Sequence, residues 1–209
     1  HQLGKLPVRA VVYSHSHIAH FGVVLGLIIE QDAQSFLVHF IAPSGFMEEA
    51  FAENVYACNA MSRRAGLQFG RGIPSGPYGQ VDSAVGKALA AGTTGLIAPS
   101  LIIENGYEEH VIDGVRMVFQ NTPGTEAPAE MNTWFPDEKV FWAAENITAT
   151  VHNIYTLRGA LVRDALQWSK QINEALYRFG QDAEVLVSSH NWPRWGNERI
   201  QQVMRTQRD

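Results

Sequence analysis

A short apolar run that ends directly in a histidine cluster constrains this chain more than any other feature. Residues 8–13 are mostly apolar and β-branched, which predicts a buried strand. The next seven residues contain three histidines: His15, His17 and His20. Ligand sites in α/β proteins form just past the carboxyl ends of buried strands. A solvated turn or a purification tag would also explain so many histidines. A tag, however, does not follow a buried strand and precede a glycine-containing apolar helix.

The spacing of these histidines predicts a metal site. His15 and His17 lie two apart, so on an extended stretch they point the same way and can chelate one ion. His20 lies further round the turn, where it is better placed for a second ion nearby. The single cysteine, Cys58, excludes an internal disulfide and a cysteine-based zinc cluster. Histidine and carboxylate must therefore supply the ligands, and imidazole suits zinc.

Three further candidates follow other predicted strands: Glu126, Glu145 and His190. Both glutamates are flanked by small residues after an apolar strand, where an unpaired carboxylate is costly to bury and favours a nearby cation. The alternative is that the glutamates cap the next helix or turn. A lone histidine such as His190 is more often structural, but its place after a strand repeats that of the other candidates.

The rest of the chain alternates between strand and helix patterns, which predicts a layered α/β fold. Apolar spacing of three and four indicates helices, and short apolar or alternating runs indicate strands. The expected helices are 21–29, 45–70, 157–179 and 197–205. The expected further strands are 36–41, 95–98, 109–112, 115–121, 140–144 and 184–188. Residues 71–86, rich in glycine, are expected to form a loop.

Charge and hydropathy exclude two classes of partner. The formal net charge is -5 and no run of lysine or arginine appears, which argues against nucleic acid. The longest apolar stretch, residues 21–29, is too short to span a bilayer, so no transmembrane segment is expected. No signal peptide opens the chain, and the compartment, whether cytoplasmic, periplasmic or secreted, is left open.

The motifs together resemble the metallo-β-lactamase superfamily and, within it, the alkyl sulfatases that hydrolyse detergents such as dodecyl sulfate. The superfamily pattern His-x-His-x-Asp-His is matched by residues 15–20 except at Ala19. The sulfatase resemblance extends over segments 45–50, 59–65, 96–99, 123–131, 155–159 and 192–197. It implies a metallo-β-lactamase-like αββα sandwich, with residues 1–209 as a partial catalytic domain. The family's N-terminal strands and its C-terminal dimerisation and lipid-binding regions are expected to be absent.

The resemblance also implies a function for each candidate. The first zinc ion would be held by His15, His17 and Glu126, and the second by His20 and His190, with Glu145 between the two. Glu145 and His20 would be catalytic. Arg158, at the start of the predicted long helix, would grip the sulfate group of an alkyl sulfate. The family resemblance further implies a homodimer.

Three departures from the family pattern concern this site. Ala19 replaces the motif aspartate, and Ala149 and Asn191 stand where the family usually has histidine. The loss at position 19 predicts one tight zinc site and a weakened second one. Two other functions stay open: an inactive homologue with a binding or structural role, and another hydrolase acting on lactones, thioesters or phosphodiesters.

Overall fold

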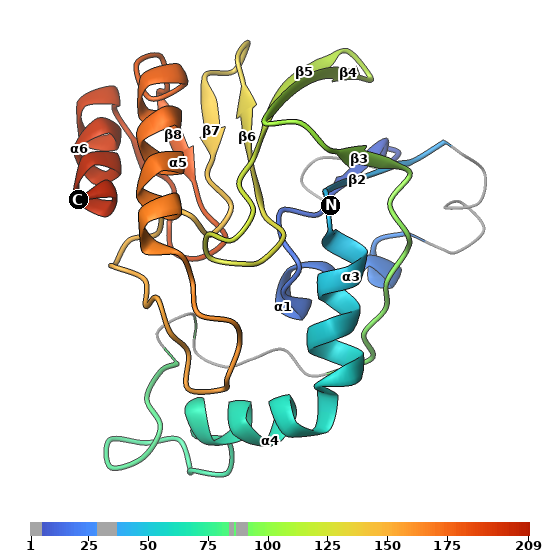
Figure 1. Cartoon of the computed structure of the whole chain (residues 1–209), viewed down its shortest axis with the longest axis vertical. Helices are drawn as coiled ribbons and strands as arrows, with labels where there is room; N and C mark the ends of the chain where they lie inside the picture. Colours follow the sequence, from blue (N-terminus) through green and yellow to red (C-terminus); the bar gives the residue numbers. More distant parts are fainter. Residues whose placement is uncertain (1–5, 29–36, 84–85, 87–91) are drawn as a thin grey trace.

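Two β-sheets lie between layers of helices in the computed structural model, which describes residues 6–28, 37–83, 86 and 92–209 (Figure 1). The smaller sheet is parallel, and its strands in spatial order are β1 (Ala10–Val12), β2 (His39–Pro43) and β3 (Leu101–Ile103). The larger sheet is mixed and follows sequence order: β4 (Tyr107–Ile112), β5 (Val115–Asn121), β6 (Met131–Phe135), β7 (Val140–Trp142), β8 (Val185–Val187) and β9 (Arg194–Trp195).

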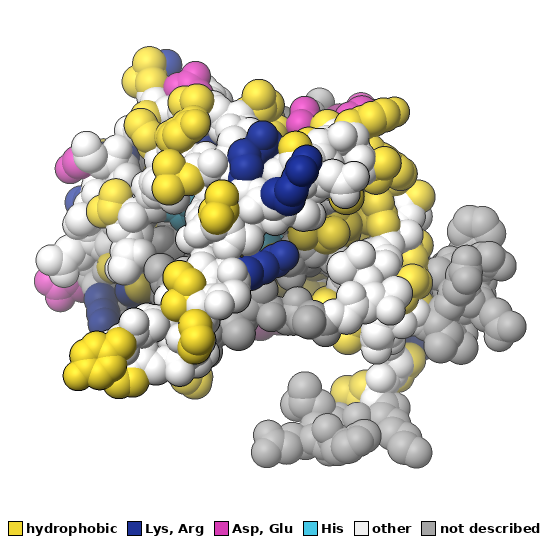
Figure 2. All heavy atoms as spheres, turned by 90° about the horizontal axis from the view of Figure 1, so that it is seen from below, with side chains coloured by type: hydrophobic (Ala, Val, Ile, Leu, Met, Phe, Trp, Pro, Cys, Tyr) yellow, Lys and Arg dark blue, Asp and Glu magenta, His cyan; other side chains and the backbone are white. Residues whose placement is uncertain are grey.

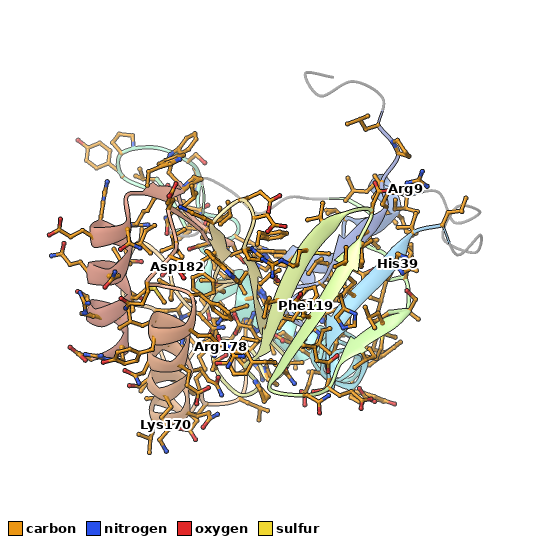
Figure 3. The ribbon with its side chains drawn as sticks, turned by 90° about the horizontal axis from the view of Figure 1, so that it is seen from above. Arg9, His39, Phe119, Lys170, Arg178 and Asp182 are labelled. Atoms are coloured by element: carbon orange, nitrogen blue, oxygen red, sulfur yellow. The ribbon has the colours of Figure 1, made fainter. Side chains whose placement is uncertain are left out.

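A central core fills the space between the two sheets. Ile41 and Ile103 of the smaller sheet pack against Met117, Phe119 and Met131 of the larger one. All five are buried, so this layer excludes water from both inner faces. In Figure 3, Phe119 lies between His39 of β2 and the labelled residues Lys170 and Arg178 of the helical layer.

Helices cover the outer face of each sheet. On the larger sheet, α5 (Ala165–Arg178) and α6 (Asn197–Arg208) bury an apolar cluster that includes Trp168, Leu176 and Ile200. On the smaller sheet, α1 (Ile18–Phe21) and α3 (Phe46–Phe51) pack aromatic rings against Tyr13. A π-helical turn, Ala52–Tyr56, then leads into α4 (Cys58–Gln68). The layered αββα arrangement expected from the sequence is therefore confirmed.

The strands expected at 109–112 and 115–121 form an antiparallel hairpin, as β4 and β5. Asp113 and Gly114 both have positive φ values, 51° and 83°, which suits the two-residue turn of a right-twisted hairpin. None of the helices in the described ranges is long and apolar enough to cross a bilayer.

The predicted helix 157–179 is wrong over its first eight residues, because α5 begins only at Ala165. Asp164 is the N-cap, and its side chain accepts a hydrogen bond from the Gln167 N–H at 2.9 Å. Before it, Gly159 has φ +90° and Leu161 is 70% exposed, so that apolar residue is not part of a buried helical face. Arg158 thus lies in an irregular segment and not, as expected, at the start of the helix.

Two other predictions are corrected. Residues 95–98 form no strand, because Gly95 bonds to the Gly22 carbonyl and Ile97 accepts the Tyr13 hydroxyl; the strand follows Pro99 as β3. The predicted helix 21–29 is instead the short α1 and a 3₁₀ turn, Val24–Gly26, with residue 29 outside the described part. The strands β6 and β9 were not predicted.

Candidate metal centre

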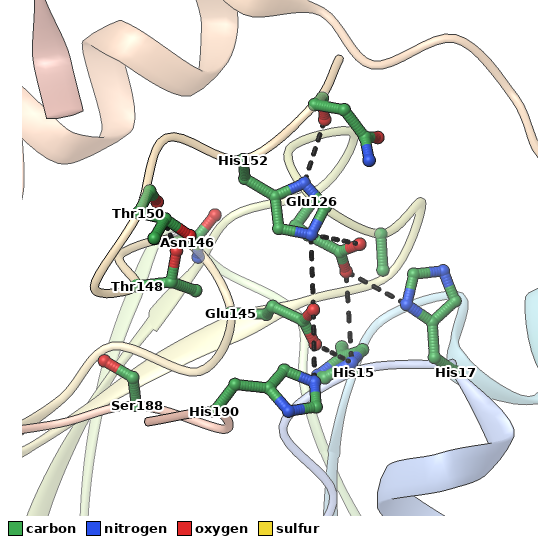
Figure 4. A network of polar contacts seen from close by, with 12 residues as sticks. His15, His17, Glu126, Glu145, Asn146, Thr148, Thr150, His152, Ser188 and His190 are labelled. Carbon is green, nitrogen blue, oxygen red and sulfur yellow. Dashed lines mark hydrogen bonds and ion pairs between the residues drawn. The ribbon is translucent and has the colours of Figure 1, made fainter. Parts of the chain in front are cut away.

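Strand ends bring distant parts of the chain together at one edge of the two sheets. The histidine cluster follows β1, Glu126 follows β5, Glu145 follows β7 and His190 follows β8. A backbone bridge between His15 and Glu130 joins the first of these segments to the second. The side chains then face a common centre, as Figure 4 shows.

The first group of potential metal ligands consists of His15, His17, Glu126 and Glu145, whose ligand atoms lie within 4.8 Å of one another. His17 Nδ1 is 2.9 Å from Glu126 Oε2. His15 Nε2 is 3.2 Å from Glu145 Oε2 and 3.9 Å from Glu126 Oε2. This group contains the three residues expected at the first zinc ion, with Glu145 added.

The second group consists of His20, Glu145 and His190. His20 Nε2 is 3.2 Å from Glu145 Oε2, and His190 Nε2 is 3.4 Å from Glu145 Oε1. Glu145 thus belongs to both groups, because its Oε2 faces both His15 and His20 while its Oε1 faces His190. The six residues that the sequence singled out as ligands are all brought together.

The chemistry of the first group fits a divalent cation. His15 Nε2, Glu126 Oε2 and Glu145 Oε2 are buried and have no hydrogen-bond partner among the described residues. Buried polar atoms without partners are costly, and three of them aimed at one point are satisfied by a metal ion. The Ser14 hydroxyl lies 3.0 Å from His15 Nδ1, so a proton shared there leaves the Nε2 lone pair free to ligate.

The protonation states of these groups also suit metal binding. Burial lowers the pKa of His15 to about 4, which keeps its imidazole neutral. Burial opposes ionisation of Glu126, but the neighbouring His17 outweighs it and brings the Glu126 pKa to about 2. Burial likewise opposes ionisation of Glu145, and the surrounding histidines, His15 first among them, hold its pKa well below its usual range.

A fully buried third acid, Glu130, connects the loops that carry the other two. Its Oε1 accepts the Glu145 N–H and its Oε2 accepts the Ala127 N–H, both at 2.9 Å. Burial and the charge of Glu126 raise the pKa of Glu130 well above its usual range. Glu130 lies in the family-like segment 123–131, but no sequence signal predicted its function.

His152 is a further residue of the site that sequence reasoning missed. Its Nε2 lies 3.3 Å from Glu145 Oε1 and 3.6 Å from Glu126 Oε1, so it faces both carboxylates. It lies in an irregular segment after β7, where no strand end or periodicity marks it. Its only sequence signal is that it is a histidine within a family-like segment.

Arg158 lies at the edge of the first group. Its Nη2 is 3.1 Å from His17 Nε2 and 3.1 Å from Glu53 Oε1, on the π-helical turn. Its backbone N–H donates to Gln68 Oε1 at 2.7 Å, which ties this segment to α4. Its Nη1 is buried and finds no hydrogen-bond acceptor within the part of the chain that the structure describes. A buried guanidinium N–H without an acceptor is a ready donor to an anion.

The departures from the family pattern lie around this centre. Ala19 is exposed on α1, one residue before His20. The other two are in contact, because the Ala149 N–H donates to Asn191 Oδ1 at 3.0 Å. Asn191 has φ 73°, a left-handed conformation that asparagine tolerates better than most residues.

The centre is recessed rather than exposed. Figure 2 shows lysine and arginine side chains at this surface and only small areas of histidine between other atoms. The side chains of His17, His20 and His190 are 11%, 16% and 18% exposed. Small solutes can therefore reach the histidines, while the carboxylates below them are almost shielded from water.

The family follows from the sequence signature of the Metallo-beta-lactamase superfamily, which matches residues 1–190. The chain belongs to this superfamily. The recognised family and the fold expected from it are thus confirmed, and the superfamily together with the two ligand groups indicates a metal-binding protein.

Among curated proteins the chain is similar to sulfatases. It is 48% identical over 203 residues to an alkyl/aryl-sulfatase of Saccharomyces cerevisiae, covering 97% of this chain and 31% of that protein. It is 47% identical to a linear primary-alkylsulfatase of Pseudomonas sp., covering 98% of this chain and 30% of that protein. The chain therefore spans about a third of the length of these relatives.

A solved structure extends the similarity to three dimensions. The chain matches a stereoselective inverting sec-alkylsulfatase from Pseudomonas sp. with a TM-score of 0.95 and 45% identity. The match covers 98% of this chain and 32% of that one.

Proposed function

We propose that residues 1–209 form a zinc-dependent catalytic domain that hydrolyses alkyl sulfate esters. The observation that carries the proposal is the convergence of three unpartnered buried ligand atoms, from His15, Glu126 and Glu145, beside the unpartnered Nη1 of Arg158. A metal centre next to an anion-binding guanidinium suits an ester of a strong oxyacid. The relatives named alkyl sulfatases support the same substrate class.

Zinc is proposed because the donors are imidazole and carboxylate without thiolate. Magnesium and calcium prefer oxygen ligands throughout, whereas His15, His17, His20 and His190 supply nitrogen. Two zinc ions, when bound at these ligands, would supply hydroxide from water near neutral pH.

The chain's own residues then perform the remaining tasks. Arg158 binds the sulfate group, whose oxygens match the guanidinium fork, and its charge stabilises the sulfate as it departs. Glu145 links the two groups of histidines, because its Oε2 lies 3.2 Å from both His15 Nε2 and His20 Nε2. Glu145 and His20 are proposed to lie next to the attacking water, because both belong to the second ligand group.

Ala19 is proposed to weaken the second zinc site. Without the motif aspartate, that group has three candidate ligands, whereas zinc is usually held by four. We expect the wild-type protein to bind about one zinc ion tightly and a second weakly. Ala19→Asp, on an exposed position, should raise the second affinity at least about tenfold and increase the hydrolysis rate. Full binding of two ions by the wild-type protein would contradict this.

The hydrolysis test measures sulfate released from dodecyl sulfate by zinc-reconstituted protein. Arg158→Met should lower kcat/KM by about 100-fold, in the range found for the loss of one charge-stabilising donor. Arg116→Met is the matched control, since Arg116 is half-exposed and pairs with Asp137 on the surface. It should retain wild-type activity.

Two outcomes would replace the proposal. Faster turnover of a lactone, thioester or phosphodiester than of dodecyl sulfate would move the protein to another hydrolase class. Zinc binding without turnover of any of these, before and after Ala19→Asp, would favour a binding or structural module. The homodimer implied by the family stays a prediction, which light scattering can test.

A further inference from the structure

Arg163 is a buried arginine that is not among the proposed metal ligands and does not contact the proposed substrate donor. Its side chain is 5% exposed, and it precedes α5 by two residues. Burying a guanidinium is expensive unless its N–H groups find acceptors. Those acceptors reveal what this residue does.

One side of the Arg163 guanidinium donates two hydrogen bonds to Glu126. Nε donates to the Glu126 backbone carbonyl at 2.6 Å, and Nη2 donates to Glu126 Oε1. Because backbone and carboxylate are held by the same rigid plane, the side chain of Glu126 has little freedom to rotate. Its other oxygen, Oε2, is left facing His17 Nδ1 and His15 Nε2.

The other side of the guanidinium holds the segment between β7 and α5. Nη1 donates to Asn153 Oδ1 at 2.6 Å and to the Asn153 carbonyl at 3.2 Å. The Arg163 N–H also donates to the Ile154 carbonyl at 2.9 Å. His152 directly precedes this anchor, and Arg158 lies in the loop that the anchor closes.

We propose that Arg163 is a positioning residue that sets the metal-facing oxygen of Glu126 and fixes the loop of His152 and Arg158 against it. The planar Arg163 guanidinium thereby couples the position of Glu126 in the first metal group to the position of Arg158. Hydrogen-bonding partners of ligating carboxylates commonly serve this purpose. The inference rests on the metal site of the proposed function.

The sign of the effect distinguishes positioning from simple neutralisation of charge. If Arg163 only compensated the negative charge of Glu126, its removal would leave a more attractive carboxylate and strengthen zinc binding. If it positions Oε2, its removal frees the side chain to rotate and weakens zinc binding. Loss of such a partner typically costs about 10–100-fold in metal affinity.

The experiment measures the zinc dissociation constant of the first site by competition with a chromophoric chelator. Arg163→Met, which keeps the length of the side chain, should weaken zinc binding about 10–100-fold. Arg163→Lys should weaken it at least about tenfold, because an ammonium cannot span Glu126 and Asn153 together. Arg116→Met should leave the dissociation constant unchanged, since Arg116 pairs with Asp137 at the surface.

Thermal unfolding of the metal-free proteins separates positioning from stability. A lowered unfolding temperature with unchanged zinc affinity in Arg163→Met would overturn the proposal, as would tighter binding. If Arg163→Met does not fold, Arg163→Lys decides in the same way. Failure of the wild-type protein to bind zinc would instead refute the metal site itself, so the two failures are distinguishable.

Discussion

Replacing Trp168 by Phe tests how the helical layer supports the metal centre. Trp168 is 7% exposed on α5, and its Nε1–H donates to the Asn146 carbonyl at 2.9 Å. Asn146 is itself buried and directly follows Glu145. The indole ring also lies against His152, with 5.7 Å between ring centroids. A single side chain thus connects the helical core to two residues of the site.

The expected loss of stability comes from two sources. Phenylalanine cannot donate to the Asn146 carbonyl, and a buried acceptor deprived of its donor costs about 1–3 kcal/mol. The smaller ring leaves part of the indole space unfilled, which adds about 1 kcal/mol. The sum, roughly 2–4 kcal/mol, corresponds to a Tm lower by about 5–15 °C for a chain of this size.

Thermal unfolding followed by circular dichroism measures this change. Trp192→Phe is the control, because it makes the same chemical change at a residue that is 88% exposed. It should alter stability by less than about 0.5 kcal/mol. Equal melting temperatures for the two variants would refute the reasoning that the indole hydrogen bond supports the site.

Three further predictions concern single groups. Asp164→Ala removes the cap on the Gln167 N–H and should cost about 1 kcal/mol in urea unfolding, whereas Asp164→Asn, which can still cap, should cost much less. Burial raises the pKa of Tyr13 to about 12, so its contribution to the free energy of unfolding is complete below about pH 10 and is lost as the pH rises through about 12. Tyr13→Phe should remove this loss of stability between about pH 10 and 12, and the same loss in the variant would contradict the prediction. Zinc at about 100 times its dissociation constant should stabilise the folded protein by about 2.7 kcal/mol, reversed by a chelator, and a Tm insensitive to zinc would argue against the site.

The parts of the site that sequence could predict are those that follow strands. An apolar run predicts a buried strand, and the residues that follow such a strand lie at the edge of the sheet where the strand ends. His15, Glu126, Glu145 and His190 all belong to this class, and the structure brings their side chains together. Their roles as zinc ligands stay predictions.

The parts that sequence could not predict lie on irregular segments. His152 and Arg163 reach the centre through a loop whose path depends on contacts far along the chain, such as that with Glu126. The start of α5 was misplaced for a related reason: the apolar spacing continues upstream to Leu161, but that side chain is exposed. Periodicity cannot distinguish an apolar residue that faces a core from one that faces away.

Ala19, in place of the motif aspartate, also affects the stability of the metal-free protein, because the centre already holds buried negative charge. The centre already holds three buried acids, Glu126, Glu130 and Glu145, with Arg163 as the buried cation bonded to one of them. Burial and the charge of Glu126 raise the pKa of Glu130, which shows that negative charge is already costly there before any metal binds. A further carboxylate beside His20 would add an oxygen ligand for the second ion and increase the repulsion that the metal-free fold must bear. We therefore expect Ala19→Asp to bind the second zinc ion more tightly and to be less stable than the wild-type protein when metal is removed.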